Sequence, residues 1–238
     1  MSYFLSSNKL ALKKLVIING QEARHILLAR RVKVGEHITL QDPTEQRFNC
    51  QVKAIKKNEL EVLVLTKAIT PAEPKTPVTL LQAAIAEQAL DIVLQKATEL
   101  GVSEICIFIA DFSPNSPKDP LKKLERWRKI VQEATKQSER LRPPIISLSA
   151  SLENALGHHS KAHILYCHPH ADTSEEIRIP HTSTVIIIGP EGGFSEKELS
   201  LVKAQKNSFP LNLGPRILRS ETAAITSLAI IQYLNKNL

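Results

Sequence analysis

Three glycines fall within five residues in the segment GPEGG, residues 189–193, directly after the apolar run 185–188. Glycine adopts positive φ and lets a backbone approach a ligand closely, so this segment could cradle a small molecule. Ser195 and Glu198 then have the spacing of a capping box, which predicts a rigidly held turn into a helix. A tight turn without a ligand would have the same spacing, so both interpretations stay open.

A second segment, LGPRILRSETA at residues 213–223, places two arginines and a glutamate at the start of an apolar C-terminal helix. We predict Ser220 as the N-cap of this helix, with Glu221 complementing the helix dipole in the first turn. Charged groups so close to a helix start are costly to bury unpaired. The segment is therefore either an Arg–Glu pair that pins the loop or a site that handles charge.

The elements around both segments alternate between strands and helices, which predicts a parallel α/β sheet with helices on both faces. The expected strands are residues 78–82, 105–109, 145–148, 164–167, 185–188 and 210–213. One helix is expected after strand 78–82, with Leu90, Val93, Leu94 and Ala97 on one face and its end at Gly101, and a second over residues 120–138. In such sheets, ligands bind beyond the carboxyl ends of the strands, where the two segments lie. Neither GxGxxG nor a P-loop motif is present, which argues against a conventional dinucleotide fold and against P-loop nucleotide hydrolysis.

The N-terminal part has a different pattern of elements. Short strands are expected at residues 15–18, 37–40, 48–55 and 60–66, and one helix is expected at 21–31. Short strands at this spacing suggest a small β-barrel. The proline-rich stretch 69–77 is typical of a linker. We therefore expect two domains, residues 1–70 and 71–238.

Composition restricts the class of protein. The 238 residues are 42% hydrophobic, and the net charge of +7 favours polyanionic partners such as nucleic acid. No apolar run reaches the roughly 20 residues that span a bilayer, and the start lacks signal-peptide order, so we expect a cytoplasmic protein without a membrane segment. The 4% aromatic content argues against an open sheet that stacks bases on aromatic platforms.

Cysteine and histidine usage predicts neither disulfides nor a metal site. The three cysteines are scattered and odd in number, so buried reduced thiols are expected. Several histidines cluster in sequence near Cys167, but without paired zinc-ligand spacings. These histidines are His158, His159, His163, His168 and His170.

Together, GPEGGFS and LGPRILRSETA resemble the paired signature of the RsmE family of 16S ribosomal RNA methyltransferases. Three further segments resemble the same family: LDIVLQKATELGVSEI at residues 90–105, WRKIVQEATKQSERLRPP at 127–144 and HILLARRVKVGE at 25–36. The resemblance implies a C-terminal SPOUT trefoil-knot methyltransferase domain and a small N-terminal PUA-like β-barrel that binds RNA. It also implies S-adenosylmethionine as the cofactor, a homodimer, and methylation of N3 of a uridine in 16S rRNA of the small ribosomal subunit.

The resemblance also assigns roles to individual residues. Arg219 and Arg216 would face the target base or the cofactor carboxylate, and Glu221 or water would accept the proton. The expected cofactor-binding residues are Ile188, Gly189, Glu191, Gly192, Gly193, Leu213, Gly214, Ile217, Leu218 and Thr222. The expected RNA-binding residues are Arg24, Arg30, Arg31, Lys33, Gln137 and Arg140.

Two departures from the family pattern bear on the target contacts. Residues 84–89 read AIAEQA, where the family carries a basic, glycine-containing run, and Phe112 stands where the family has an arginine. These losses leave two alternatives open. One is a non-catalytic rRNA-binding or assembly factor, and the other is a knotted methyltransferase acting on another RNA, such as a tRNA ribose 2′-OH.

Overall fold

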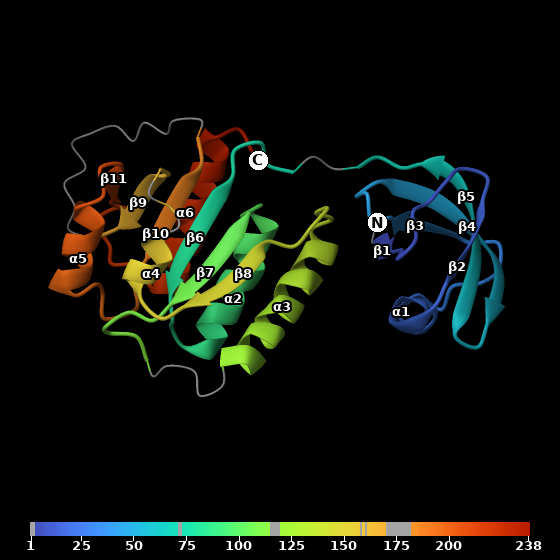
Figure 1. The fold of residues 1–238 in the computed structure, drawn as a ribbon, viewed down its shortest axis with the longest axis horizontal. Coiled ribbons are helices and arrows are strands. Elements are labelled where there is room, and N and C mark those ends of the chain that lie inside the picture. Colours follow the sequence, from blue (N-terminus) through green and yellow to red (C-terminus); the bar gives the residue numbers. More distant parts are fainter. Residues whose placement is uncertain (1–2, 71–72, 115–119, 158, 160, 170–181) are drawn as a thin grey trace. The chain divides into compact units, whose positions relative to one another are not determined.

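The structure is a computed structural model that describes residues 3–70, 73–114, 120–157, 159, 161–169 and 182–238. The chain divides into two compact units (Figure 1). One unit comprises Met1–Ala72 together with Glu139–Arg142, and the other comprises Glu73–Ser138 and Pro143–Leu238.

The N-terminal unit is built on a five-stranded sheet in the order β1-β3-β4-β5-β2. Its strands are β1 (Tyr3–Leu5), β2 (Leu15–Ile18), β3 (His37–Gln41), β4 (Arg47–Lys56) and β5 (Glu59–Lys67). The helix α1 (Gly20–Arg30) packs against β1 and β5 and helps to enclose a core of apolar side chains. Four of these strands and the helix match the prediction, whereas β1, at three residues, is too short to give a periodic pattern.

A short segment from the middle of the chain completes this unit. The side chain of Arg47 is 4% exposed. Its Nη2 donates to the carbonyl oxygens of Glu139, at 2.7 Å, and Arg140, at 3.0 Å. Its guanidinium carbon also lies 3.8 Å from the centre of the Tyr3 ring. Backbone carbonyls and a ring face thus stabilise this buried cation, which joins segments more than 90 residues apart in sequence.

The C-terminal unit contains a six-stranded sheet in the order β11-β9-β10-β6-β7-β8, and every neighbouring pair is parallel. Its strands are β6 (Val78–Ala83), β7 (Glu104–Phe108), β8 (Ile145–Ser149), β9 (His163–Cys167), β10 (Thr184–Ile188) and β11 (Ser208–Leu211). Its helices are α2 (Glu87–Glu99), α3 (Pro120–Gln137), α4 (Leu152–Leu156), α5 (Glu196–Lys203) and α6 (Ser220–Leu234). The predicted parallel α/β sheet is confirmed. The short helix α4 was not predicted, and β11 ends two residues before the expected Leu213.

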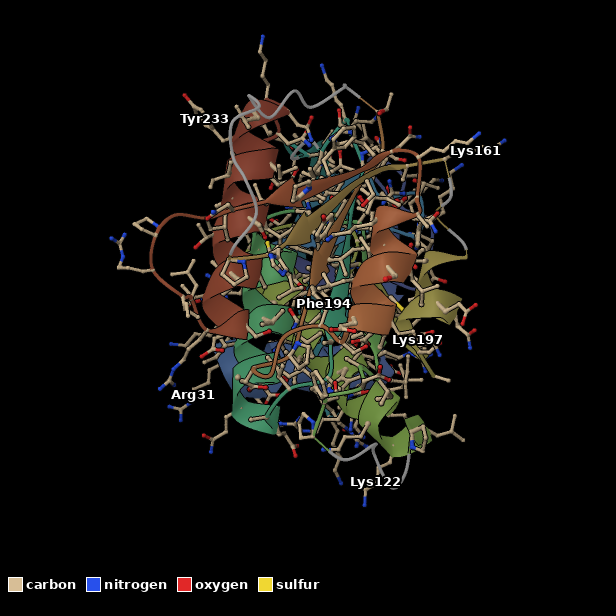
Figure 2. All side chains as sticks on the ribbon, turned by 90° about the vertical axis from the view of Figure 1, so that its left-hand side faces the viewer. Arg31, Lys122, Lys161, Phe194, Lys197 and Tyr233 are labelled. Carbon is tan, nitrogen blue, oxygen red and sulfur yellow. The ribbon has the colours of Figure 1, made fainter. Side chains whose placement is uncertain are left out.

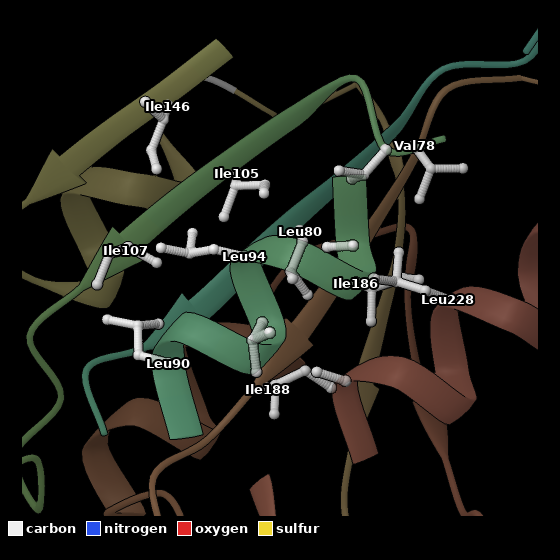
Figure 3. Packing of buried hydrophobic residues seen from close by; sticks show 14 of the residues in the cluster. Val78, Leu80, Leu90, Leu94, Ile105, Ile107, Ile146, Ile186, Ile188 and Leu228 are labelled. Atoms are coloured by element: carbon white, nitrogen blue, oxygen red, sulfur yellow. The ribbon is translucent and has the colours of Figure 1, made fainter. Parts of the chain in front are cut away.

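The two faces of this sheet are covered by different helices. Successive residues of a strand point to opposite faces. In β10, Ile186 and Ile188 accordingly join the core beneath α2, α3 and α6, whereas Val185 and Ile187 join the core beneath α4 and α5. Figure 3 shows the first core, with side chains from α2 and α6 packed over the strands. Burial of both faces explains why these strands are almost continuously apolar in sequence.

The last helix returns from the edge of the sheet to its middle. The chain leaves edge strand β11 at Leu211, and α6 begins at Ser220 beside the ends of β10 and β6. The segment between them therefore crosses the carboxyl ends of β9 and β10, as the expected trefoil knot requires. No helix in the described ranges is long and apolar enough to cross a membrane.

Candidate active site

Three segments that follow neighbouring strands enclose a cleft at the carboxyl edge of the C-terminal sheet. They are the residues after β9, β10 and β11, and the cleft between them has a volume of about 440 Å³. Small-molecule pockets usually have volumes of about 300–1,000 Å³. The cleft is lined by Cys167, His168, Pro169, Ile188, Gly189, Pro190, Glu191, Gly193, Phe194, Leu211, Asn212, Leu213, Gly214, Arg216, Ile217, Leu218, Arg219, Ser220 and Ala223.

A buried hydrogen-bonded chain joins two walls of this cleft. The Ser220 hydroxyl donates to the carbonyl oxygen of Gly189 at 2.7 Å and accepts from Nε2 of Gln82 at 2.9 Å. Gln82 is fully buried at the end of β6, and its Oε1 has no partner among the described atoms. The prediction of Ser220 as N-cap is wrong, because the N-cap is Arg219 and makes no side-chain capping bond. Ser220 instead ties the start of α6 to the glycine-rich loop.

The glycine-rich loop is held in one conformation by the helix that follows it. The predicted capping box is confirmed, since Glu198 accepts from the amide of Ser195 and Ser195 accepts from the amide of Glu198. A Cβ on Gly189 would lie 3.2 Å from the ring of Phe194, which is tighter than normal packing. Figure 2 shows Phe194 among the side chains of this unit. A Cβ at residue 189 would therefore require the Phe194 ring to shift by a few tenths of an ångström, and the loop as it stands presents an ordered backbone to the cleft.

The second loop presents its charges to solvent. Gly214 has φ +113°, a conformation that side-chain-bearing residues rarely adopt, and its amide donates to Oδ1 of Asn212 at 2.9 Å. Arg216 and Arg219 are both exposed on the cleft. Neither guanidinium forms an ion pair with any residue that the structure describes, so the interpretation of a pinning Arg–Glu pair is not supported. Both positive charges remain available to a ligand.

Most of the predicted site residues meet at this cleft. Those on its lining are Ile188, Gly189, Glu191, Gly193, Leu213, Gly214, Arg216, Ile217, Leu218 and Arg219. Those outside the lining are Gly192, Glu221 and Thr222. Cys167, His168 and Pro169, at the end of β9 and just after it, also line the cleft and were not predicted, although the rule that parallel strands end at one edge could have indicated them.

The acidic segment that departs from the family pattern has a structural role. Glu87 accepts from Nζ of Lys123 at 2.7 Å and pairs with Nη1 of Arg126 at 2.9 Å. The hydrogen bond from Lys123 and the charge of Arg126 lower the pKa of Glu87. Arg126 also pairs with Asp91. Lys123 and Arg126 of α3 thus form ion pairs that hold α3 against α2.

The predicted RNA-binding residues lie on both units. Arg24, Arg30, Arg31 and Lys33 are exposed on α1 or just after it. Gln137 is exposed at the end of α3, and Arg140 belongs to the segment that completes the N-terminal unit.

The described cysteines and histidines are free thiols and imidazoles that are not gathered into a metal site. All three cysteines are free thiols, and burial raises the pKa of Cys167 at the cleft to about 12. His163 stacks on Phe209 at 4.9 Å, and burial lowers its pKa. His158 and His170 lie outside the described residues. Within the described ranges, no three His, Cys, Asp or Glu side chains are grouped to hold a metal ion.

Comparison with known proteins identifies the family of both parts of the chain. Residues 72–232 match the family model of an RNA methyltransferase domain, and residues 18–65 match that of an RNA methyltransferase PUA domain. The chain is 31% identical to ribosomal RNA small subunit methyltransferase E of Rickettsia conorii, with 98% of this chain and 96% of the relative covered. For the enzyme of the same name from Bacillus subtilis, the identity is 30%, with 91% and 89% covered.

Two solved structures extend this likeness to the fold. Ribosomal RNA small subunit methyltransferase E from Neisseria gonorrhoeae, bound to S-adenosylmethionine, superimposes with a TM-score of 0.85 at 29% identity over 98% of each chain. A Legionella pneumophila methyltransferase in complex with the same cofactor gives 0.83 at 28% identity, with 98% of this chain and 97% of that chain covered. The resemblance inferred from GPEGGFS and LGPRILRSETA is confirmed, and the chain belongs to the ribosomal RNA small subunit methyltransferase E family of RNA methyltransferases.

Proposed function

We propose that this protein transfers a methyl group from S-adenosylmethionine to N3 of a uridine in 16S rRNA of the small ribosomal subunit. The proposal depends above all on the cleft in which Ser220 joins the glycine-rich loop to a loop bearing two exposed arginines. We further propose that the enzyme acts as a cytoplasmic homodimer.

The residues of the cleft fit this cofactor. The two loops present a largely apolar lining with backbone groups, as expected for a pocket that holds an adenine and a sulfonium. Apart from its chain neighbours, no described residue has a heavy atom within 4 Å of the position that a Cβ on Gly214 would take, which leaves the backbone there open on this side. Gly189, Leu213, Gly214, Ile217 and Leu218 would hold the cofactor, which supplies an electrophilic methyl group.

The chain's own residues would supply positioning and charge. Holding donor and acceptor in line can account for much of the acceleration of such a displacement. N3 of uridine is a weak acid, and its negative charge spreads onto the ring carbonyls when the proton leaves. Arg219 and Arg216 can stabilise that charge but cannot accept the proton, because guanidinium stays protonated. Since Glu221 lies outside the cleft lining, we assign the proton to water.

The N-terminal unit would bind RNA through the cations near α1. Arg24, Arg30, Arg31 and Lys33 are exposed, and each phosphate contact would add counterion release to the binding free energy. Gln137 and Arg140 would add contacts from the end of α3 and the segment after it.

The test uses purified protein, labelled S-adenosylmethionine and small ribosomal subunits from a strain that lacks its own enzyme. We expect label at N3 of one 16S uridine. Removing a preorganised charge that stabilises the transition state typically costs about 10²–10³-fold in kcat, and we expect this for Arg219→Ala. Lys161→Ala, which removes an exposed cation before β9, should have no effect. Label on ribose or on tRNA would refute the uridine assignment, and absence of cofactor binding would favour a non-catalytic binding factor.

A further inference from the structure

Phe112 is an exposed aromatic residue in the loop that follows β7. Its side chain is 56% exposed, whereas Phe4, Phe48 and Phe108 are each less than 5% exposed. Phe209 is 41% exposed, but its ring stacks on His163. No ring packs against Phe112 among the residues that the structure describes. The exposed part of an apolar ring gains nothing from folding and is available to a partner.

One side of this loop is tied to the same capping box that orders the glycine-rich loop. The amide of Asp111 donates to Oε1 of Glu198 at 3.2 Å. The carboxylate of Asp111 accepts from the hydroxyl of Ser195 at 2.6 Å. The position of Phe112 is therefore coupled to the start of α5.

The other side of the loop is tied to the end of β6. The Ser113 hydroxyl donates to the carbonyl oxygen of Ala84 at 2.8 Å and accepts from the amide of Ala110 at 3.1 Å. The amide of Ser113 also donates to the carbonyl oxygen of Ala110 at 3.0 Å. Hydrogen bonds on both sides of Phe112 thus hold its backbone in place, so a partner would need to order only the side chain.

The ring lies beside the cleft without lining it. A Cβ on Gly192 would lie 3.0 Å from Cβ and 3.5 Å from Cγ of Phe112, so the phenylalanine packs directly on this glycine. The two neighbours of Gly192, Glu191 and Gly193, line the cleft, but Gly192 and Phe112 do not. Phe112 therefore lies just outside the cleft, in contact with a residue between two lining residues.

We propose that Phe112 is the stacking platform for an unpaired nucleobase adjacent to the target uridine. The target base must enter the cleft to reach the methyl donor, which leaves the ring at the rim for its neighbour on the strand. Aromatic side chains bind unpaired RNA bases by stacking on their faces. This role needs an exposed aromatic face and no positive charge, which Phe112 supplies. The inference depends on the proposed rRNA methylation and assigns one contact within it.

The experiment compares Phe112→Ala, Phe112→Leu and Phe112→Trp in the full chain, with Phe209→Leu as the matched control. Phe209 is a partly exposed phenylalanine that packs on the first residue of β9, at the opposite, amino edge of the sheet. Loss of one stacked base typically weakens binding about 5- to 150-fold. We expect KM for the small subunit to rise within that range for the alanine and leucine variants, with kcat changed less. Phe112→Trp should retain the wild-type KM, and the control should not change it.

Two further measurements separate stacking from simpler effects. The dissociation constant for S-adenosylmethionine and the melting temperature should stay at wild-type values for all three variants, because Phe112 lies outside the cleft lining and is exposed. A small subunit with an abasic site next to the target uridine should have a higher KM with the wild-type enzyme than the intact subunit. With Phe112→Ala, the abasic and the intact subunit should have the same KM. Wild-type KM in Phe112→Leu, or additive effects of leucine and abasic site, would overturn the stacking role. Failure of the wild type itself to methylate the subunit would instead refute the proposed function.

Discussion

Ser220→Ala tests whether the link between the two loops shapes the cofactor site. The substitution removes the hydroxyl that donates to Gly189 and accepts from Gln82. Gln82 Nε2 would keep only its 3.0 Å bond to the carbonyl of Ala83, and Oε1 already has no partner among the described atoms. Because Gln82 is fully buried, water cannot replace the lost partner without rearrangement.

The magnitude follows from the number of groups that lose a partner. Leaving a buried donor or acceptor unsatisfied costs about 1–3 kcal/mol. For a domain of this size, each kcal/mol lowers Tm by about 2–4 °C, so we expect Ser220→Ala to lower Tm by about 2–12 °C. If the whole of this free energy orders the loops for the cofactor, its loss raises the Kd for S-adenosylmethionine by at most about 150-fold, because 1.4 kcal/mol corresponds to tenfold.

Thermal unfolding and calorimetric titration with S-adenosylmethionine measure the two effects. Thr135→Val is the control, because it removes a buried hydroxyl whose 2.6 Å bond to the carbonyl of Val131 is local to α3. It should leave the cofactor Kd unchanged. A double-mutant cycle of Ser220→Ala with Gln82→Leu should be non-additive, because the two side chains share one bond. Wild-type cofactor affinity in Ser220→Ala, or full additivity in the cycle, would show that the link does not order the site.

Two further predictions concern proton transfer and pH. Glu221→Gln should lower kcat by less than about 10-fold, because we assign the proton to water; a kcat–pH profile measures this. A loss of about 10²-fold or more would instead identify Glu221 as the general base. Burial would raise the pKa of Asp42, but hydrogen bonds from the Thr44 hydroxyl and from the amides of Leu10, Thr44 and Gln46 lower it below 3.8. Because the pKa of Asp42 is lower in the folded protein than in the unfolded chain, the ionised carboxylate adds to the free energy of unfolding above pH 3.8. This contribution is lost as the pH falls through the pKa of Asp42 in the folded protein. Asp42→Asn should therefore lower Tm at pH 7, with the gap to wild type closing below about pH 4; a gap independent of pH would contradict this origin.

Local patterns predicted most of the elements because each carries its own signal. The near-continuous apolar runs identified the buried parallel strands, and the spacing of Ser195 and Glu198 identified the start of α5. Strand ends then placed the two loops at one edge of the sheet. Short elements such as β1 and α4 were missed because three to five residues contain too little periodicity to detect.

Long-range contacts could not be predicted in the same way. Ser220 has the residue type and position of an N-cap, yet its hydroxyl turns toward Gly189 and Gln82, which is 138 residues away. The sequence around Glu87 gives no sign of its partners, and only the packing of α2 against α3 reveals that it pairs with Lys123 and Arg126. In each case a side chain had a local option and a tertiary one, and the free energy of the complete fold selected the tertiary one.

By itself, the sequence determined the fold class, the boundaries of the main strands and helices and, through GPEGGFS and LGPRILRSETA, the family. These properties depend on residue types and their spacing along the chain. Only the tertiary structure decided which loop residues face the cleft, that the residues after β9 form part of it, and that Phe112 stays exposed on Gly192. Those outcomes depend on where separate strands end relative to one another, which follows from packing both faces of the sheet and is not encoded in any short segment.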